Sequence, residues 1–115
     1  MSYDIDFRVK VDGTDKYVSV GNCDANITWN VREMIEKSTG LEWINEANNG
    51  LCKEVVPKIA HGYSELCCFP EKYEKYESPN GWGTVEGCKR FFAEIISAYG
   101  ELDSELKGIA TFWIM

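Results

Sequence analysis

The sequence predicts one α+β domain over residues 1–115. We expect an N-terminal β-hairpin, three helices and a C-terminal strand, forming a small, mainly antiparallel three-stranded sheet with helices packed on one face. Two patterns predict this class: apolar and polar residues alternate near the N-terminus, and apolar residues recur at helical spacing in the middle of the chain. The length suits one domain, and the 13% of aromatic residues can fill a core without disulfides or metal.

The hairpin is predicted over residues 4–20. The expected first strand has a charged face and an apolar face, and the apolar face consists of Ile5, Phe7, Val9 and Val11. The segment Asp12-Gly13-Thr14-Asp15 has turn composition, and residues 16–20 resume as a second strand.

A first helix is predicted over residues 29–39, after a polar connection at 21–26. Either Thr28 or Asn30 can cap its start, since both are residue types that accept a hydrogen bond from a free helical N–H. Gly40 suits the residue after the helix, where a left-handed backbone is common. Residues 45–50 are expected to form a loop.

Three further helical segments follow. Apolar spacing predicts a helix over 51–68, in which Pro57 either kinks the helix or belongs to its first turn. A short helix is expected over 71–76, with Pro70 as its first residue. Residues 85–99 form the last long helix, with Thr84 as its cap.

Residues 109–114 are predicted to form the last strand. Both of its faces are largely apolar, so we expect a central or covered position in the sheet. The element order is then β-β-α-α-α-β, for which a sheet with helices on one face is the simplest layered arrangement.

The charge balance favours some partners over others. Nineteen acidic residues against twelve basic ones give a net charge of −7, which disfavours direct binding to a nucleic-acid backbone. Such an acidic surface commonly serves solubility, and it can also attract a partner protein with a basic surface. No apolar run approaches the roughly 20 residues that span a bilayer, and the N-terminus lacks signal-peptide features, so no membrane association and a cytoplasmic location are expected.

Five cysteines are expected to be reduced thiols without a redox role. Their number is odd, and the neighbours Cys67 and Cys68 are not a C-x-x-C motif. The paired ligand spacing of a zinc site is absent, and Cys88 falls on the apolar stripe of the last helix. We therefore expect no metal and no cofactor, and a buried Cys88.

Catalysis is not expected. Histidine is the usual base for nucleophilic catalysis, and the sequence has only His61, with no partner at a suggestive spacing. The segment Gly81-Trp82-Gly83 superficially resembles a phosphate loop but matches neither phosphate-binding glycine pattern.

Two segments are candidates for binding. Each combines amide side chains, a tryptophan and the start of a helix; the candidate residues are Asn26, Thr28, Trp29, Asn30, Asn80, Gly81, Trp82, Gly83 and Thr84. In one interpretation the polar residues are helix caps and the tryptophans are core. In the other, the two segments face one pocket, in which Trp and Asn bind a flat polar ligand such as a nucleotide.

These segments resemble a family of short, uncharacterised proteins of bacteriophages and prophage-bearing bacteria. The matching motifs are Ala25-Asn26-Ile27-Thr28-Trp29-Asn30, Pro70-Glu71-Lys72-Tyr73 and Asn80-Gly81-Trp82-Gly83-Thr84. The chain departs from the family pattern at Leu102-Asp103-Ser104-Glu105, where a different turn is expected. The resemblance implies a phage or prophage accessory protein, and by analogy an inhibitor of a host defence or regulatory component. The alternative is a pocket for a nucleotide-like signal.

Overall fold

Strand β1 (Ser2–Lys10) is a central strand of an antiparallel sheet in the computed structural model, which describes residues 1–115. The sheet runs in the order β2-β1-β5-β4, and β3 pairs with the N-terminal part of β1. The other strands are β2 (Tyr17–Ser19), β3 (Asn26–Thr28), β4 (Ala47–Leu51) and β5 (Thr111–Ile114). The α+β class is confirmed, and so is the expected central position of the last strand, because β5 lies between β1 and β4.

The predicted hairpin over 4–20 is confirmed. Arg8 is the partner of Ser19 and Val9 is the partner of Val18 in an antiparallel pair. Gly13 has a φ of +74° in the connecting turn, a conformation that glycine adopts at little cost. Strand β1 begins two residues before the predicted start, at Ser2.

The prediction of a three-stranded sheet was wrong in strand number, because the sheet has five strands. Strand β4 overlaps the segment 45–50 that was expected to be a loop, and β3 begins at the last residue of the predicted polar connection. Neither segment has a strong alternating pattern. Strand β4 is extended because it pairs with β5, with a register shift between Asn48 and Leu51.

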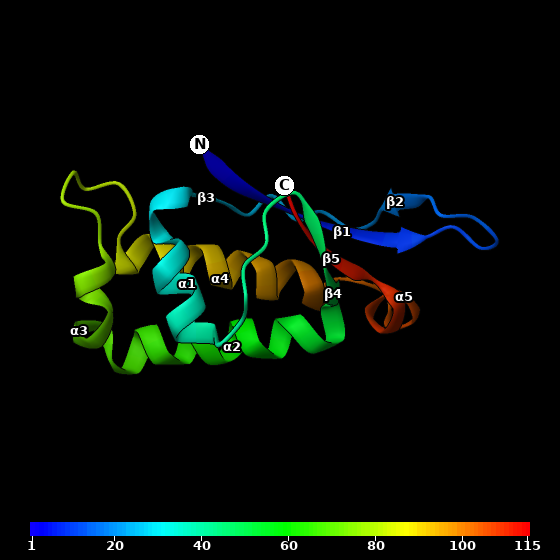
Figure 1. Cartoon of the computed structure of the whole chain (residues 1–115). Helices are drawn as coiled ribbons and strands as arrows, with labels where there is room; N and C mark the ends of the chain where they lie inside the picture. The colour runs from blue at the N-terminus through cyan, green and yellow to red at the C-terminus, as the bar shows by residue number, and fades with distance from the viewer.

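Five helices accompany the sheet. They are α1 (Arg32–Thr39), α2 (Cys52–Cys68), α3 (Pro70–Tyr73), α4 (Val85–Gly100) and α5 (Ser104–Ile109). Figure 1 shows α1, α2 and α4 on one side of the strands, which confirms the predicted packing. Helix α5 was missed. It places Ile109 in a helix instead of the predicted strand, and β5 begins at Thr111.

The residues that begin and end the helices were predicted from the sequence. Gly40 ends α1 with a φ of +77°, Pro70 is the first residue of α3, and the side chain of Thr84 caps α4; all three predictions are confirmed. The prediction that Thr28 or Asn30 caps the first helix was wrong. A 3-10 turn at Trp29–Val31 precedes α1, and neither side chain makes a capping hydrogen bond. Thr28 is instead held in β3 by its pairing with Ser2.

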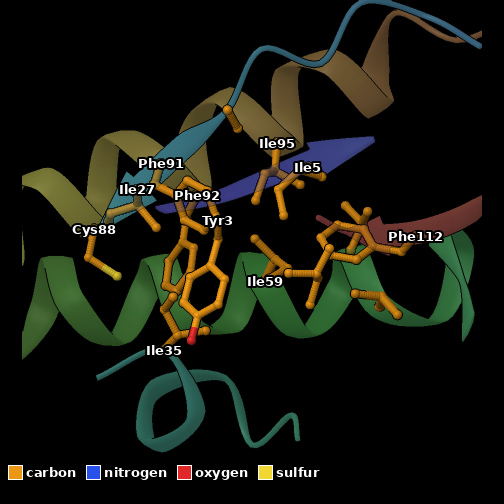
Figure 2. Packing of buried hydrophobic residues seen from close by; sticks show 14 of the residues in the cluster. Tyr3, Ile5, Ile27, Ile35, Ile59, Cys88, Phe91, Phe92, Ile95 and Phe112 are labelled. Atoms are coloured by element: carbon orange, nitrogen blue, oxygen red, sulfur yellow. The ribbon is translucent and has the colours of Figure 1, made fainter. Parts of the chain in front are cut away.

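The core fills the space between the sheet and the two long helices (Figure 2). The sheet contributes Tyr3, Ile5 and Phe7 from β1 and Phe112 and Ile114 from β5, all buried. Helices α2 and α4 contribute the facing side chains Val55, Val56, Ile59, Leu66, Cys88, Phe91, Phe92 and Ile95. This packing holds β1 and the start of α4 in place, and both border the site described next.

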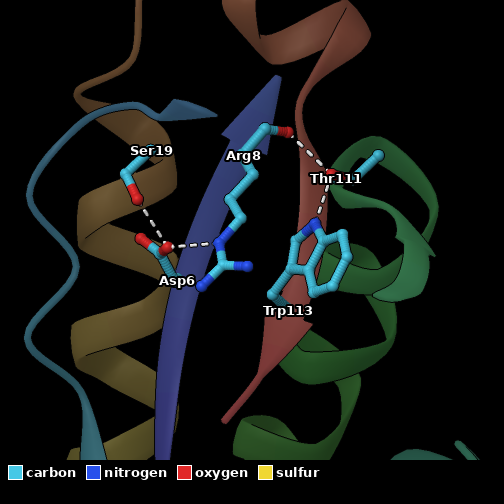
Figure 3. Close-up of polar contacts among 5 residues, drawn as sticks. All are labelled: Asp6, Arg8, Ser19, Thr111 and Trp113. Atoms are coloured by element: carbon cyan, nitrogen blue, oxygen red, sulfur yellow. Dashed lines mark hydrogen bonds and ion pairs between the residues drawn. The ribbon is translucent and has the colours of Figure 1, made fainter. Parts of the chain in front are cut away.

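The opposite face of the sheet carries polar and aromatic side chains (Figure 3). Asp6 accepts hydrogen bonds from Arg8 Nε at 2.7 Å and from Ser19 Oγ at 2.6 Å. Trp113 Nε1 donates to Thr111 Oγ1, whose own hydroxyl donates to the Arg8 carbonyl. No helix covers this network.

Candidate functional site

The largest hollow in the molecule is an open groove of about 560 Å³ at the end of the sheet where β1 begins. Its lining defines what we call the Trp82 groove: Met1, Ser2, Asn26, Ile27, Thr28 and Trp82. The groove therefore joins the N-terminal strand to both segments that the sequence singled out. Three smaller hollows lie elsewhere, at the hairpin turn, beside α4 and between α2 and α4.

Gly83 brings the two predicted segments together. Its φ is +91°, and a Cβ atom added there would lie 2.5 Å from Val31 Cγ1 and 3.2 Å from Thr28 Cγ2. Only a residue without a side chain can make this approach in this conformation. The loop before α4 is therefore seated directly against β3 and the start of α1.

Large apolar side chains are exposed around the groove. Trp82 is 67% exposed and Met1 is 88% exposed. The interpretation in which both tryptophans belong to the core is therefore wrong for Trp82. Burial of its large apolar area by another molecule would be favourable.

Trp29 is anchored beside the groove without lining it. Its ring stacks on Tyr3 with 5.9 Å between ring centroids, and its Nε1–H donates to the Ser2 carbonyl at 3.0 Å. These contacts leave the side chain 38% exposed. Trp29 thus supports the wall of the groove and adds apolar surface at its margin.

The three amide side chains expected to bind a flat ligand do not converge on the groove. Asn80 Oδ1 accepts hydrogen bonds from the Trp82 N–H and from Ser78 Oγ, which closes a local turn around Gly81. Asn30 is exposed in the 3-10 turn and does not line the groove. Of the expected amides, only Asn26 lines it.

Thr84 acts at the base of the loop and outside the groove. Its Oγ1 accepts a hydrogen bond from the Gly87 N–H at 3.0 Å, the usual geometry of a helix cap. Glu77 adds a second cap, because its carboxylate accepts from the Val85 N–H at 2.8 Å. Together these bonds fix the loop that carries Trp82 to the start of α4.

One carboxylate, that of Asp4, is hydrogen-bonded to a residue that lines the groove. Asn26 Nδ2 donates to Asp4 Oδ1 at 2.7 Å and to Ser2 Oγ at 3.1 Å. Asp4 is exposed and forms no ion pair with a basic side chain. A carboxylate without a basic partner therefore stands close to the apolar groove.

Another hollow, of about 390 Å³ and lined by acidic side chains, lies between the segment before β3 and helix α4. Its lining includes the carboxylates of Asp24, Glu94 and Glu101, and none of the three forms an ion pair. This surface can attract basic groups of another molecule by long-range electrostatics.

Sequence reasoning missed Met1, Ser2 and Ile27 as lining residues. The alternating pattern of β1 extends back to Ser2, so its place on the face shared with Asp4 could have been found. That these residues share a groove with Trp82 could not be found from the sequence, since it depends on the position of Gly83 against Val31 and Thr28.

The remaining reactive side chains are scattered. His61 is exposed on α2, and no group of three or more His, Cys, Asp or Glu residues is placed to hold a metal ion. All five cysteines are free; Cys52 and Cys88 are buried as core residues, whereas Cys67 and Cys68 are exposed. Burial raises the pKa of Cys52 from 9.0 to about 12, which disfavours its thiolate form.

Comparison with known proteins finds no matching family model, no matching curated protein and no matching solved structure. No helix has both the length and the apolar character that crossing a bilayer requires.

Proposed function

We propose that this chain is a phage- or prophage-type accessory protein that acts by binding a protein partner, without catalysis, and thereby inhibits a host defence or regulatory component. The observation that carries the proposal is the exposure of Trp82 beside Met1 in the Trp82 groove. Tryptophan is enriched among the residues that dominate the energy of protein interfaces. The loop packs against β3 and the start of α1 while the Trp82 ring stays exposed to solvent, which suits a contact with a partner.

The charge of the surface supports a basic partner. The chain carries a net charge of −7, and the carboxylates of Asp4, Asp24, Glu94 and Glu101 have no basic partner within the molecule. Opposite charge on a partner would accelerate association and orient the encounter. A defence or regulatory component that holds nucleic acid has such a basic surface.

A second candidate function is binding of a small nucleotide-like molecule. The volume of the groove favours it, since about 560 Å³ lies within the roughly 300–1,000 Å³ typical of ligand pockets. The ring of Trp82 offers a stacking surface, and Asn26 Oδ1 makes no hydrogen bond within the chain. The open shape and the local bonding of Asn80 favour the protein partner over this candidate.

Native mass spectrometry of the chain purified from an expressing bacterial host tests both candidates. Trp82→Ala is compared with Ile109→Ala, a control on α5 whose side chain is 53% exposed and does not line the groove. We expect a co-purified protein that Ile109→Ala retains and Trp82→Ala loses.

A bound species of a few hundred daltons with the same dependence would favour the small-molecule candidate. Equal retention by both variants, or no bound species in the parent, would contradict binding at the Trp82 groove.

A further inference from the structure

The backbone N–H and carbonyl groups of β3 alternate between facing β1 and facing away from it. Ile5 N–H donates to the Ala25 carbonyl, and Trp29 N–H donates to the Met1 carbonyl, both at 3.2 Å. Between these bonds Tyr3 is the direct partner of Ile27. Because backbone groups alternate along an antiparallel strand, Asn26 and Thr28 direct their N–H groups away from β1.

This outer edge of β3 has no strand beside it. Strand β3 pairs only with β1, and no turn, loop or side-chain hydrogen bond involves the N–H or the carbonyl of Asn26. Asn26 is exposed, and its backbone N–H and carbonyl have no hydrogen-bond partner within the chain. An unpaired strand edge is a template for an added extended segment.

The Trp82 groove lies along the same three residues. Asn26, Ile27 and Thr28 all line it, although the side chain of Ile27 is buried, so the backbone of β3 forms part of its wall. Trp82 borders the groove near Thr28, because Gly83 lies against Thr28 Cγ2. Asp4 lies at the other end, held by Asn26.

We propose that an extended segment of the partner protein adds to β3 as a further strand; this inference rests on the protein-binding function proposed above. Side chains two residues apart on a strand share a face. The segment would place an apolar side chain beside Thr28, against Trp82 and Met1, and two residues along a Lys or Arg side chain beside Asn26, within reach of Asp4.

The outer edge of β3 is short, so the proposed segment also needs the contact with Trp82. Three residues of β3 present only two outward-facing positions, so backbone bonds alone give little affinity and an anchor side chain is required. A helix would satisfy its own backbone and leave this edge unpaired. The free edge, the apolar wall and the unpaired carboxylate together specify an extended, apolar-x-basic segment.

The experiment uses a displayed library of random heptapeptides, selected on the full chain and counter-selected on Trp82→Ala. Selected peptides are synthesised with and without methyl groups on alternate backbone nitrogens, and their affinities are measured. Asn26→Pro removes one outward N–H, whereas Asn26→Ala removes the side chain alone. Ser19→Pro is the control at an outward-facing position of β2, remote from the groove.

We expect selected peptides with the apolar-x-basic pattern. Methylation of the nitrogens that face β3 and the Asn26→Pro substitution should each weaken binding at least tenfold, while methylation of the intervening nitrogens and Ser19→Pro change it less than twofold. Hydrogen exchange of the Asn26 amide should slow at least tenfold in the complex. The methylated peptides keep the test decisive even if Asn26→Pro does not fold.

Three results overturn the inference in different ways. Trp82-dependent binding that tolerates methylation at every nitrogen would contradict strand addition and leave the proposed function standing. Recovery of no Trp82-dependent peptide would contradict both. If the free chain forms a dimer in which the Asn26 amide is protected from hydrogen exchange, the outer edge of β3 pairs with a second copy of the chain, and this result would also overturn the inference.

Discussion

The guanidinium carbon of Arg8 lies 4.6 Å from the centre of the Trp113 ring, on the sheet face that no helix covers. The same guanidinium donates to Asp6, and Tyr17 meets the edge of the indole with 5.1 Å between ring centroids. Tyr17 belongs to β2 and Trp113 to β5, so the two rings meet across β1. This small cluster ties three strands together without a second layer of structure.

The Arg8–Trp113 contact should stabilise the fold measurably. A double-mutant cycle with Arg8→Ala and Trp113→Ala is expected to give a coupling energy of about 0.5–1 kcal/mol, the usual range for a partly exposed cation–π pair. The control is the pair Lys10 and Asp15, whose side chains are far more exposed. That pair should give almost no coupling, and equal coupling in both cycles would contradict the prediction.

Trp82 should contribute little to stability. Trp82→Ala is expected to lower the free energy of unfolding by about 1 kcal/mol or less, because the side chain is largely exposed. Phe92→Ala, at a fully buried position, should cost about 3–5 kcal/mol. Urea unfolding of both variants beside the parent measures the difference, and a loss above 3 kcal/mol for Trp82→Ala would place the ring in the core.

Gly83 and Gly81 should respond differently to alanine. Both have positive φ angles, and that conformation costs a residue with a Cβ about 1–2 kcal/mol. A Cβ at Gly81 meets nothing within 4 Å, whereas one at Gly83 collides with Val31. Gly83→Ala should therefore destabilise the chain by about 3 kcal/mol or more, measured by thermal unfolding. Equal losses would mean that the loop is not seated as described.

Stability should fall in alkaline solution. Burial raises the pKa of Cys23 from 9.0 to about 11 and that of Cys52 to about 12, and it raises the pKa of Cys88 further. The folded chain thus holds these protons more tightly than the unfolded chain. The resulting stabilisation is fully present below about pH 9 and is lost as the pH rises toward the raised values.

Cys88→Ala tests this account of the alkaline range. The variant loses some packing at every pH. From pH 9 to 11, however, its free energy of unfolding should decline less steeply than that of the parent, and the difference between the two slopes should be up to about 1.4 kcal/mol per pH unit for a fully buried thiol. Cys68→Ala, at an exposed position, should keep the slope of the parent. The measurement is the urea midpoint at several pH values, and parallel slopes for all three proteins would contradict the prediction.

Thiol labelling should separate the cysteines by burial. Without prior reduction, the native chain is expected to react rapidly at Cys67 and Cys68 and to protect Cys52 and Cys88. All five should react after denaturation. Mass spectrometry of the labelled peptides checks both statements, and a denatured protein with fewer than five labels would indicate a disulfide.

Several elements of the fold could be predicted because their signals are local. The alternation along residues 4–11 specifies which face of β1 is buried, and a turn of four residues returns the chain to pair with it. Thr84 and Gly40 act on backbone groups within three or four residues of themselves. Such features depend on short-range sterics and hydrogen bonds, so the sequence alone determined them.

Strands β3 and β4 depend on partners far away in the sequence. Asn26–Thr28 is extended because it pairs with β1, and Ala47–Leu51 because it pairs with β5, at least 60 residues later. Neither segment carries a pattern that distinguishes it from a loop. Their conformation is decided by backbone hydrogen bonds that exist only once the sheet has assembled.

The candidate site divides in the same way. The sequence by itself determined that two Asn- and Trp-containing segments lead into helices, and that the chain is acidic. Only the tertiary structure decided that Trp29 stacks on Tyr3 while Trp82 stays in water, and that Met1 and Ser2 join the groove. The physical reason is that burial depends on what packs beside a residue, and here the close approach of Gly83 to Val31 sets that neighbourhood.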